Sequence, residues 1–167
     1  MRTISKLPLA VLALVVSGAT AARAQTNNAS ILATANVQTP INVLGAQPLG
    51  FGNVFPGVNK TVGPDDLTNA GRFDVTGQGT APVTLSFGLP ASLSAGGPTL
   101  GIGNFQAIRS DDNAQLVGAA FFSPGASNAA TFGAAGTMFV WVGARVTPAV
   151  NQPAGLYTGT ITLTVVY

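Results

Sequence analysis

The sequence predicts an all-β protein, an immunoglobulin-like antiparallel β-sandwich, and three observations lead to this prediction. Apolar residues recur at every second position in short runs, which is the period of a strand. The 167 residues include 21 Gly and 11 Pro, which interrupt these runs every few positions. No segment has a convincing 3.6-residue apolar period, so no helix is expected. About seven or eight short strands with turn signals between them are typical of a sandwich.

The first 24 residues are predicted to be a cleaved signal peptide. Arg2 and Lys6 precede an apolar run, Leu7–Val16, which is followed by small residues that end in Ala22-Arg23-Ala24. A charged start, an apolar centre and an A-x-A ending are the layout of a secretory signal. The apolar run is shorter than the ~20 residues that a transmembrane helix needs. We therefore expect an exported protein without a transmembrane helix, located in the periplasm, at the outer cell surface or outside the cell.

Cleavage after this segment would leave a single domain of 143 residues, 25–167, with few charges. The formal charge of the whole chain is +2, but the mature part keeps four cations and five carboxylates, a net charge of −1. No basic patch remains, so nucleic acid is not an expected partner. The chain has no Cys, so apolar burial must stabilise the fold without disulfides.

The runs of alternating residues give the expected strands in chain order. Residues 31–37 form the first run, and Ile41 and Val43 continue its parity beyond Pro40. The later runs cover residues 49–54, 73–75, 83–89, 100–105 and 119–122. Each of them ends at or near a Gly or Pro, as strands separated by turns do.

Two strands are expected near the C-terminus. Residues 137–142 are apolar on both faces, which predicts a central strand or one whose second face meets a partner. Residues 151–155, Asn-Gln-Pro-Ala-Gly, are a turn that leads into the last strand.

Residues 157–167 alternate more strictly than any other stretch. One parity is apolar, with Gly159 as its only gap: Tyr157, Ile161, Leu163, Val165 and Tyr167. The other parity is made of hydroxyls: Thr158, Thr160, Thr162 and Thr164. We expect the apolar row to lie in the sandwich core. An unpaired edge beside such a row is an aggregation hazard unless a partner covers it.

No set of residues predicts catalysis. The mature chain has no His, Cys or Glu, so the usual nucleophile and base pairs are missing, and we expect no enzyme, no cofactor and no metal site. The pairs Asp65-Asp66 and Asp111-Asp112 lie in polar loops without the alternating spacing of a calcium loop, which favours solvated turn residues. Lys60 lies in a turn, and nothing supports a Ser–Lys pair. Phe139 and Trp141 could form a sugar platform, but aromatic residues in an apolar strand are more often core.

Several blocks of the sequence, in this order, resemble a known family. They are Leu49–Gly57 (LGFGNVFPG), Phe73–Gly77 (FDVTG), Leu100–Phe105 (LGIGNF), Val142–Thr147 (VGARVT) and Asn151–Tyr167 (NQPAGLYTGTITLTVVY). Together they are similar to the bacterial domain-of-unknown-function family 4402. The N- and C-terminal blocks also resemble spore coat protein U domains, which are subunits of archaic chaperone–usher pili.

The second resemblance implies a mechanism. Such pilins are immunoglobulin-like sandwiches without their final strand, and a periplasmic chaperone fills the open groove first. The N-terminal extension of the next subunit then replaces the chaperone by strand addition as an usher assembles the fibre. The resemblance implies a donor strand within residues 25–39, formed by Ile31, Ala33, Ala35 and Val37, and a groove for chaperone or partner along the apolar row of residues 157–167. The chain departs from these pilins at residues 39–41, because the disulfide that commonly follows their donor segment has no Cys here.

The first functional hypothesis is therefore an exported, non-enzymatic, pilin-like subunit of a fimbria or related filament, which self-associates by strand addition. An alternative places residues 31–37 in cis, as the first strand of a complete sandwich. Such a domain would be a self-contained secreted binding module, an adhesin or glycan-binding domain. A small outer-membrane β-barrel ranks last, because it needs strands of ~9–11 residues throughout and two aromatic girdles.

Overall fold

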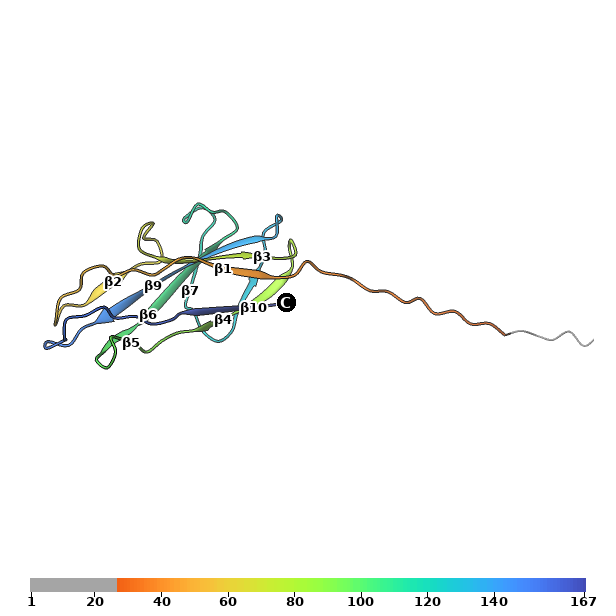
Figure 1. Ribbon diagram of the computed structural model, residues 1–167. Coiled ribbons are helices and arrows are strands. Elements are labelled where there is room, and N and C mark those ends of the chain that lie inside the picture. The colour runs from red at the N-terminus through yellow and green to blue at the C-terminus, as the bar shows by residue number, and fades with distance from the viewer. Residues whose placement is uncertain (1–26) are drawn as a thin grey trace, which may run out of the picture. The chain divides into compact units, whose positions relative to one another are not determined.

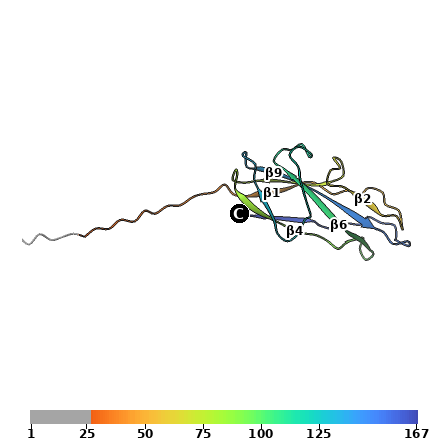
Figure 2. The same cartoon turned by 180° about the vertical axis from the view of Figure 1, so that it is seen from behind.

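The computed structural model describes residues 27–167, so the predicted signal peptide lies outside the described residues. All strand pairs in this part of the chain are antiparallel, and they form two sheets packed face to face (Figures 1 and 2). The predicted all-β antiparallel sandwich is confirmed. Residues 36–167 form one compact unit. None of the described residues belongs to a helix that is long and apolar enough to cross a membrane.

The larger sheet has the strand order β1-β3-β9-β6-β5, with β2 on β9 and β7 on β6. Its strands are β1 (Asn42–Gln47), β2 (Lys60–Val62), β3 (Gly71–Thr76), β5 (Ser92–Ser94), β6 (Thr99–Ser110), β7 (Ala120–Phe122) and β9 (Thr137–Thr147). The long strand β9 lies between β3 and β6, and both of its faces are largely buried. The prediction of a central strand that starts at residue 137 is confirmed.

The smaller sheet has the order β10-β4-β8, with β4 (Pro82–Gly88) between β10 (Thr162–Val166) and β8 (Asn128–Thr131). The alternation along β4 places Val83, Leu85 and Phe87 in the core and the residues between them outside. Facing residues of β9 complete this core, among them Met138 and Val140. The two sheets therefore meet along the predicted apolar parities of β4 and β9.

Two smaller apolar clusters complete the packing. One lies at the far end of the inter-sheet space and is formed by Leu100, Ile102, Ala144 and Val146. The other lies on the outer face of the larger sheet, where Trp141 is only 4% exposed against Ile108 and Ala70. Trp141 is therefore a core residue, as the pattern of its strand favoured.

Several sequence predictions of strands are confirmed and two are wrong. The runs at 73–75, 83–89, 100–105 and 119–122 correspond to β3, β4, β6 and β7. Residues 31–37 form no strand, and the first strand is β1, which begins at Asn42. Residues 49–54 alternate but are a loop, because Gly52 adopts a left-handed φ of 58° that a strand does not tolerate. The strands β2, β5 and β8 carry too short a pattern to be predicted.

The terminal strand is shorter than its pattern. Its ladder with β4 begins only at the pair Thr162↔Gly88, because Pro90 follows soon after and cannot donate to a ladder. Residues 157–161 are therefore extended without a continuous ladder. A single bridge, Ser94↔Thr158, holds this stretch beside β5.

Candidate functional site

The feature that stands apart in this sandwich is the outer edge of β10. This strand pairs with β4 from Thr162↔Gly88 to Val166↔Thr84, and its other edge has no strand partner among residues 27–167. The strand β1, at the edge of the larger sheet, approaches β10 on this side (Figure 1). The two sheets are thus not closed by a strand between β1 and β10.

The apolar row of β10 is only half covered. Ile161, Leu163 and Val165 pack against the inter-sheet core, yet each remains partly exposed. The neighbouring row on β4 is buried, with Leu85 at 0% exposure. The predicted orientation of the apolar row is right, but its burial is incomplete because nothing covers the open side.

A groove of about 400 Å³ lies beside residues 159–161, between the two sheet edges. Leu49, Phe73 and Leu93 contribute apolar side chains to its lining, together with Ile161. Sequence reasoning assigned only Ile161 to this site, since Leu49 lies in the loop after β1, Phe73 lies on β3 and Leu93 lies on the short strand β5. The groove is therefore formed largely by residues distant in sequence, which the alternation of residues 157–167 cannot predict.

Gly159, the gap in the apolar row, has a structural explanation. A Cβ atom at this position would lie 2.7 Å from Cδ2 of Leu93, so the leucine side chain occupies the space that a larger residue would need. Leu93 and Gly159 both line the groove. The gap thus belongs to the wall of the groove and is not a defect of the strand.

Tyr157 and Tyr167 lie at the two ends of the apolar row of β10, and the hydroxyl of each forms two hydrogen bonds. Tyr167 is 46% exposed, so its predicted place in the core is wrong. Its hydroxyl accepts a hydrogen bond from the backbone N–H of Gln78 at 2.8 Å and donates one to the carbonyl of Thr39. At the other end, the Tyr157 hydroxyl accepts a bond from Nε2 of Gln152 at 2.7 Å and donates one to the carbonyl of Pro153 at 2.8 Å. These polar partners explain why neither ring is fully buried.

The only charged side chain in the lining of the groove is neutralised. Arg72 on β3 forms an ion pair with Asp74, in which Nε lies 2.8 Å from Oδ1 and Nη2 donates a hydrogen bond to Oδ2 at 3.0 Å. Its Nη1 donates to Oδ1 of Asn113 at 3.0 Å. The groove therefore presents no free charge among the residues that line it, which suits an uncharged apolar occupant.

The expected donor residues have no place in a strand of the described chain. Ile31 is 94% exposed, Val37 is 92% exposed, and Ala33 and Ala35 are exposed as well. Leu32, which has the other parity, is exposed as well. The segment therefore keeps its alternating apolar face uncovered.

The acidic pairs act as turn residues. One carboxylate oxygen of Asp66 accepts bonds from the backbone N–H groups of Thr68 and Asn69, each at 3.0 Å, and the Asn69 amide also donates to it. These bonds, the Asn69 side chain first, lower the pKa of Asp66 below its ordinary 3.8. Asp112 accepts the N–H of Ala114 at 2.9 Å. Among residues 27–167 no three acidic, His or Cys side chains gather to hold a metal.

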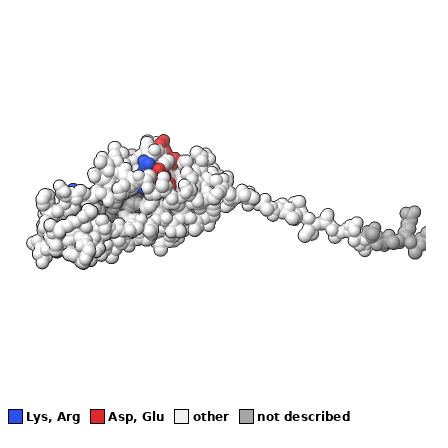
Figure 3. Space-filling model, viewed as in Figure 1, with Lys and Arg blue, Asp and Glu red and all other residues white. Residues whose placement is uncertain are grey.

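The remaining charged and aromatic candidates have structural surroundings. Lys60 begins β2 rather than a turn and donates to the carbonyl of Asn53 at 3.2 Å. Phe139 packs beside the buried Trp141, with ring centroids 6.1 Å apart, so the pair does not form an open platform. Charged side chains are sparse on the face seen in Figure 3 and gather mainly in one cluster.

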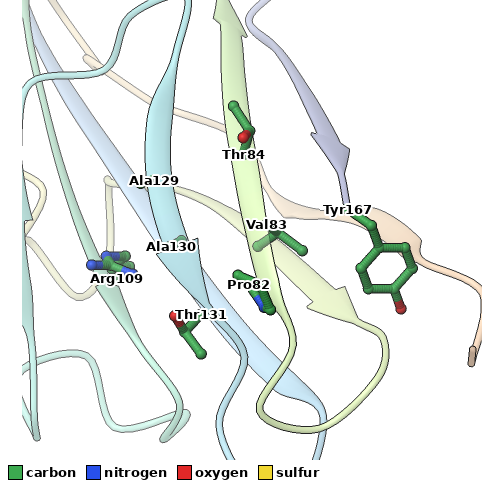
Figure 4. Close-up of a pocket in the computed structure, with 8 residues that line it drawn as sticks. All are labelled: Pro82, Val83, Thr84, Arg109, Ala129, Ala130, Thr131 and Tyr167. Carbon is green, nitrogen blue, oxygen red and sulfur yellow. The ribbon is translucent and has the colours of Figure 1, made fainter.

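A second hollow, of about 410 Å³, lies at the smaller sheet. Figure 4 shows Arg109 of β6 on one side of it and Tyr167 on the other, with β4 and β8 between them. Thr84 and Thr131 add hydroxyls to its lining. This hollow offers one cation and polar donors, in contrast to the apolar groove beside β10.

The fold and the edge define the class of the protein, an antiparallel β-sandwich with an uncovered strand edge. Residues 52–167 match the family described as Domain of unknown function (DUF4402), and the chain belongs to that family. The match covers β2 to β10 and excludes both β1 and the N-terminal segment. Comparison with curated proteins gives no match.

Proposed function

We propose that this chain is a non-enzymatic, pilin-like subunit of an exported filament, in which a segment of one copy adds as a strand to the β10 edge of another. The observation that carries the proposal is the half-covered row of Ile161, Leu163 and Val165 beside an unpaired edge. Addition of a strand to an exposed edge supplies main-chain hydrogen bonds and covers such a row. The resemblance to spore coat protein U domains points in the same direction.

The proposed occupant is the N-terminal segment of a second copy, residues 31–37. Its apolar face consists of exposed residues at every second position, as a donor strand requires. In the register that sets Val37 opposite Gly159, the small Ala35 and Ala33 lie opposite the large Ile161 and Leu163. Three of the four facing pairs then match a large side chain with a small one, and the valine lies against the groove wall that Gly159 and Leu93 form.

The contacts of Thr39 favour a second copy over the same chain. Tyr167, at the end of β10, holds the carbonyl of Thr39 by a hydrogen bond. The chain's own residues 31–37 would therefore enter from that end and run parallel to β10. A second copy can run antiparallel, which is the sense of every other strand pair in the described residues and is slightly more stable per residue.

The free-energy estimates indicate that donor binding is stabilised both by the new main-chain hydrogen bonds and by burial of the apolar row of β10. Burial of Ile31 and Val37 gains about 1.5–3 kcal/mol each. Ordering seven residues costs roughly 7–14 kcal/mol of backbone entropy at 1–2 kcal/mol per residue. The donor side chains alone do not offset this cost. The remainder must come from the new main-chain bonds and from the newly buried side chains of β10, and a periplasmic chaperone would cover the same surface before assembly.

The test compares the chain from Gln25 onward with a variant that lacks residues 25–37. We expect the longer chain to form polymers in sedimentation experiments and the truncated one to stay monomeric. The truncated subunit should bind a peptide of residues 25–39. A control peptide with Ile31→Ser and Val37→Ser should bind far more weakly. Equal polymerisation of the truncated chain would show that strand addition is wrong.

A second candidate function is a self-contained binding module, and the hollow with Arg109 is the observation that favours it. A cation with nearby hydroxyls suits an acidic or hydroxyl-rich ligand such as a glycan. In that case the chain from Gln25 onward would sediment as a stable monomer without a chaperone. Arg109→Ala would abolish ligand binding and leave the oligomeric state unchanged.

A further inference from the structure

An exposed apolar patch covers the end of the sandwich opposite the start of β1 and the end of β10. We call it the tip patch and define it as Phe55, Val58, Val150 and Leu156, whose exposures are 69%, 57%, 88% and 84%. Figures 1 and 2 show the loops that carry these residues at the same end of the molecule. The loops that carry Val58 and Val150 also contact one another, since the N–H of Gly57 donates to the carbonyl of Ala149 at 3.0 Å.

The tip patch is not explained by packing within one subunit. Tyr157 turns inward beside it and is held by Gln152 and Pro153, whereas Leu156 points outward. A patch of exposed apolar side chains at one end of a protein more often indicates a contact surface than a surface without a partner. The tip patch therefore suits an occupant of apolar or mixed character.

The chain length between donor and sandwich identifies the occupant. Four residues, 38–41, separate Val37 from the first residue of β1. Fully extended, they span roughly 13 Å at about 3.3 Å per residue. With Val37 opposite Gly159, these residues run alongside positions 158–155 in an antiparallel pair. The body of the donor copy must then begin at the tip patch of the acceptor.

The same geometry identifies the part of the donor copy that arrives there. Within each copy, Thr39 is held by Tyr167 and by the side chain of Gln78, whose Oε1 accepts from the Thr39 hydroxyl at 3.0 Å. Thr39 of the donor would lie opposite Tyr157 of the acceptor. Its Gln78 turn would therefore lie against Leu156.

We infer that the tip patch is a body-to-body interface, covered in the assembled filament by the Gln78–Tyr167 end of the next copy. This inference rests on the proposed function. It goes beyond it, because strand addition alone would permit subunits joined by a free connector, like beads on a string. The interface instead stacks neighbouring sandwiches end to end and stiffens the filament.

The experiment uses the chain from Gln25 onward and two independent reporters. The chain contains no Cys, so the pair Asn36→Cys and Thr160→Cys forms a disulfide between copies only where the donor strand lies in the proposed register. A separate variant carries photoreactive benzoylphenylalanine at position 156, with the same group at position 129 on β8 as a control. Mixed isotope-labelled and unlabelled chains distinguish crosslinks between copies from those within one.

We expect disulfide-linked ladders from the 36–160 pair, and crosslinks from position 156 to residues 76–80 or 167 of another copy at least about fivefold above those from position 129. Ladders without such crosslinks would overturn the interface and leave strand addition intact. Crosslinks from 156 to another tip patch, or to an added protein, would overturn it as well. Absence of both ladders and polymers would refute the proposed function and the interface with it. Leu156→Asp should leave the ladder yield unchanged and make filaments visibly more bent in electron micrographs.

Discussion

Leu163→Ala should weaken binding of the donor strand and destabilise the free subunit moderately, whereas Leu85→Ala should destabilise the free subunit strongly and leave donor binding unchanged. The two leucines lie on neighbouring strands of the smaller sheet and face the same core. They differ in cover, because Leu85 is fully buried and Leu163 is partly exposed on the open side. The same truncation therefore reports on two different states of the protein.

The size of each effect follows from buried area. Truncation of leucine to alanine removes about three carbon groups, worth ~2.4 kcal/mol when fully buried at ~0.8 kcal/mol each. Leu163 is already largely buried in the free subunit, so about two thirds or more of this is lost there and at most about 0.8 kcal/mol only when the donor is bound. That remainder corresponds to a roughly two- to fourfold weaker donor affinity. For Leu85, the cavity adds to the transfer cost, and about 3–5 kcal/mol of subunit stability should be lost.

The assay uses the subunit without residues 25–37. Trp141 is the single tryptophan and is buried on the outer face of the larger sheet, so its fluorescence follows urea unfolding without direct contact with the donor. Anisotropy of a labelled peptide of residues 25–39 gives the donor affinity. The reasoning fails if Leu163→Ala leaves this affinity unchanged within twofold, or if Leu85→Ala weakens it as much as Leu163→Ala does.

Three further perturbations test the fold around the site. Gly143→Ala would place a Cβ 2.4 Å from a backbone carbonyl oxygen of β2, so it should cost at least about 1–3 kcal/mol in urea unfolding; Gly103→Ala, with open space around it, should cost much less. Tyr167→Phe removes two hydrogen bonds and should cost about 0.5–1.5 kcal/mol for each bond lost, with faster amide exchange in the turn at residue 78. The lowered pKa of Asp66 means that its contribution to stability is present above pH ~4 and is lost as the pH falls through the lowered pKa. Asp66→Asn should accordingly flatten the acid limb of the stability profile measured between pH 2 and 6, and an unchanged limb would contradict this assignment.

Much of the fold follows from local pattern. The alternation at 83–89 places Val83, Leu85 and Phe87 on one face, and that face is buried. The run at 137–142 is apolar on both sides, and its strand lies in the centre of the larger sheet with a covered outer face. Such residues are predictable because the pattern of apolar residues within a strand indicates which of its faces are buried.

The edge of the site was less predictable because its limits are set elsewhere in the chain. The alternation from Tyr157 suggests a strand of eleven residues, yet the ladder starts at Thr162 because Pro90 ends the partner strand. The gap at Gly159 is filled by Leu93, a residue more than sixty positions away. The strand that was wrongly predicted at 49–54 has a different cause. Its apolar residues alternate as in a strand, but the left-handed backbone of Gly52 prevents strand formation. Pairing and turn geometry, rather than pattern, decide all three cases.

The edges of the two sheets differ in how they are protected, and this difference bears on the function. Proteins keep exposed edges from pairing with other chains by shortness, Pro or charge. The edge strand β1 is bounded by Pro40 and Pro48, while β5 has three residues and β8 has four. Residues 157–167 contain no Pro and no charged side chain, and they carry a half-covered apolar row. Among the strand edges that residues 27–167 form, the β10 edge thus combines a lack of Pro and charge with an apolar row that a partner can cover, which is the condition that strand addition requires.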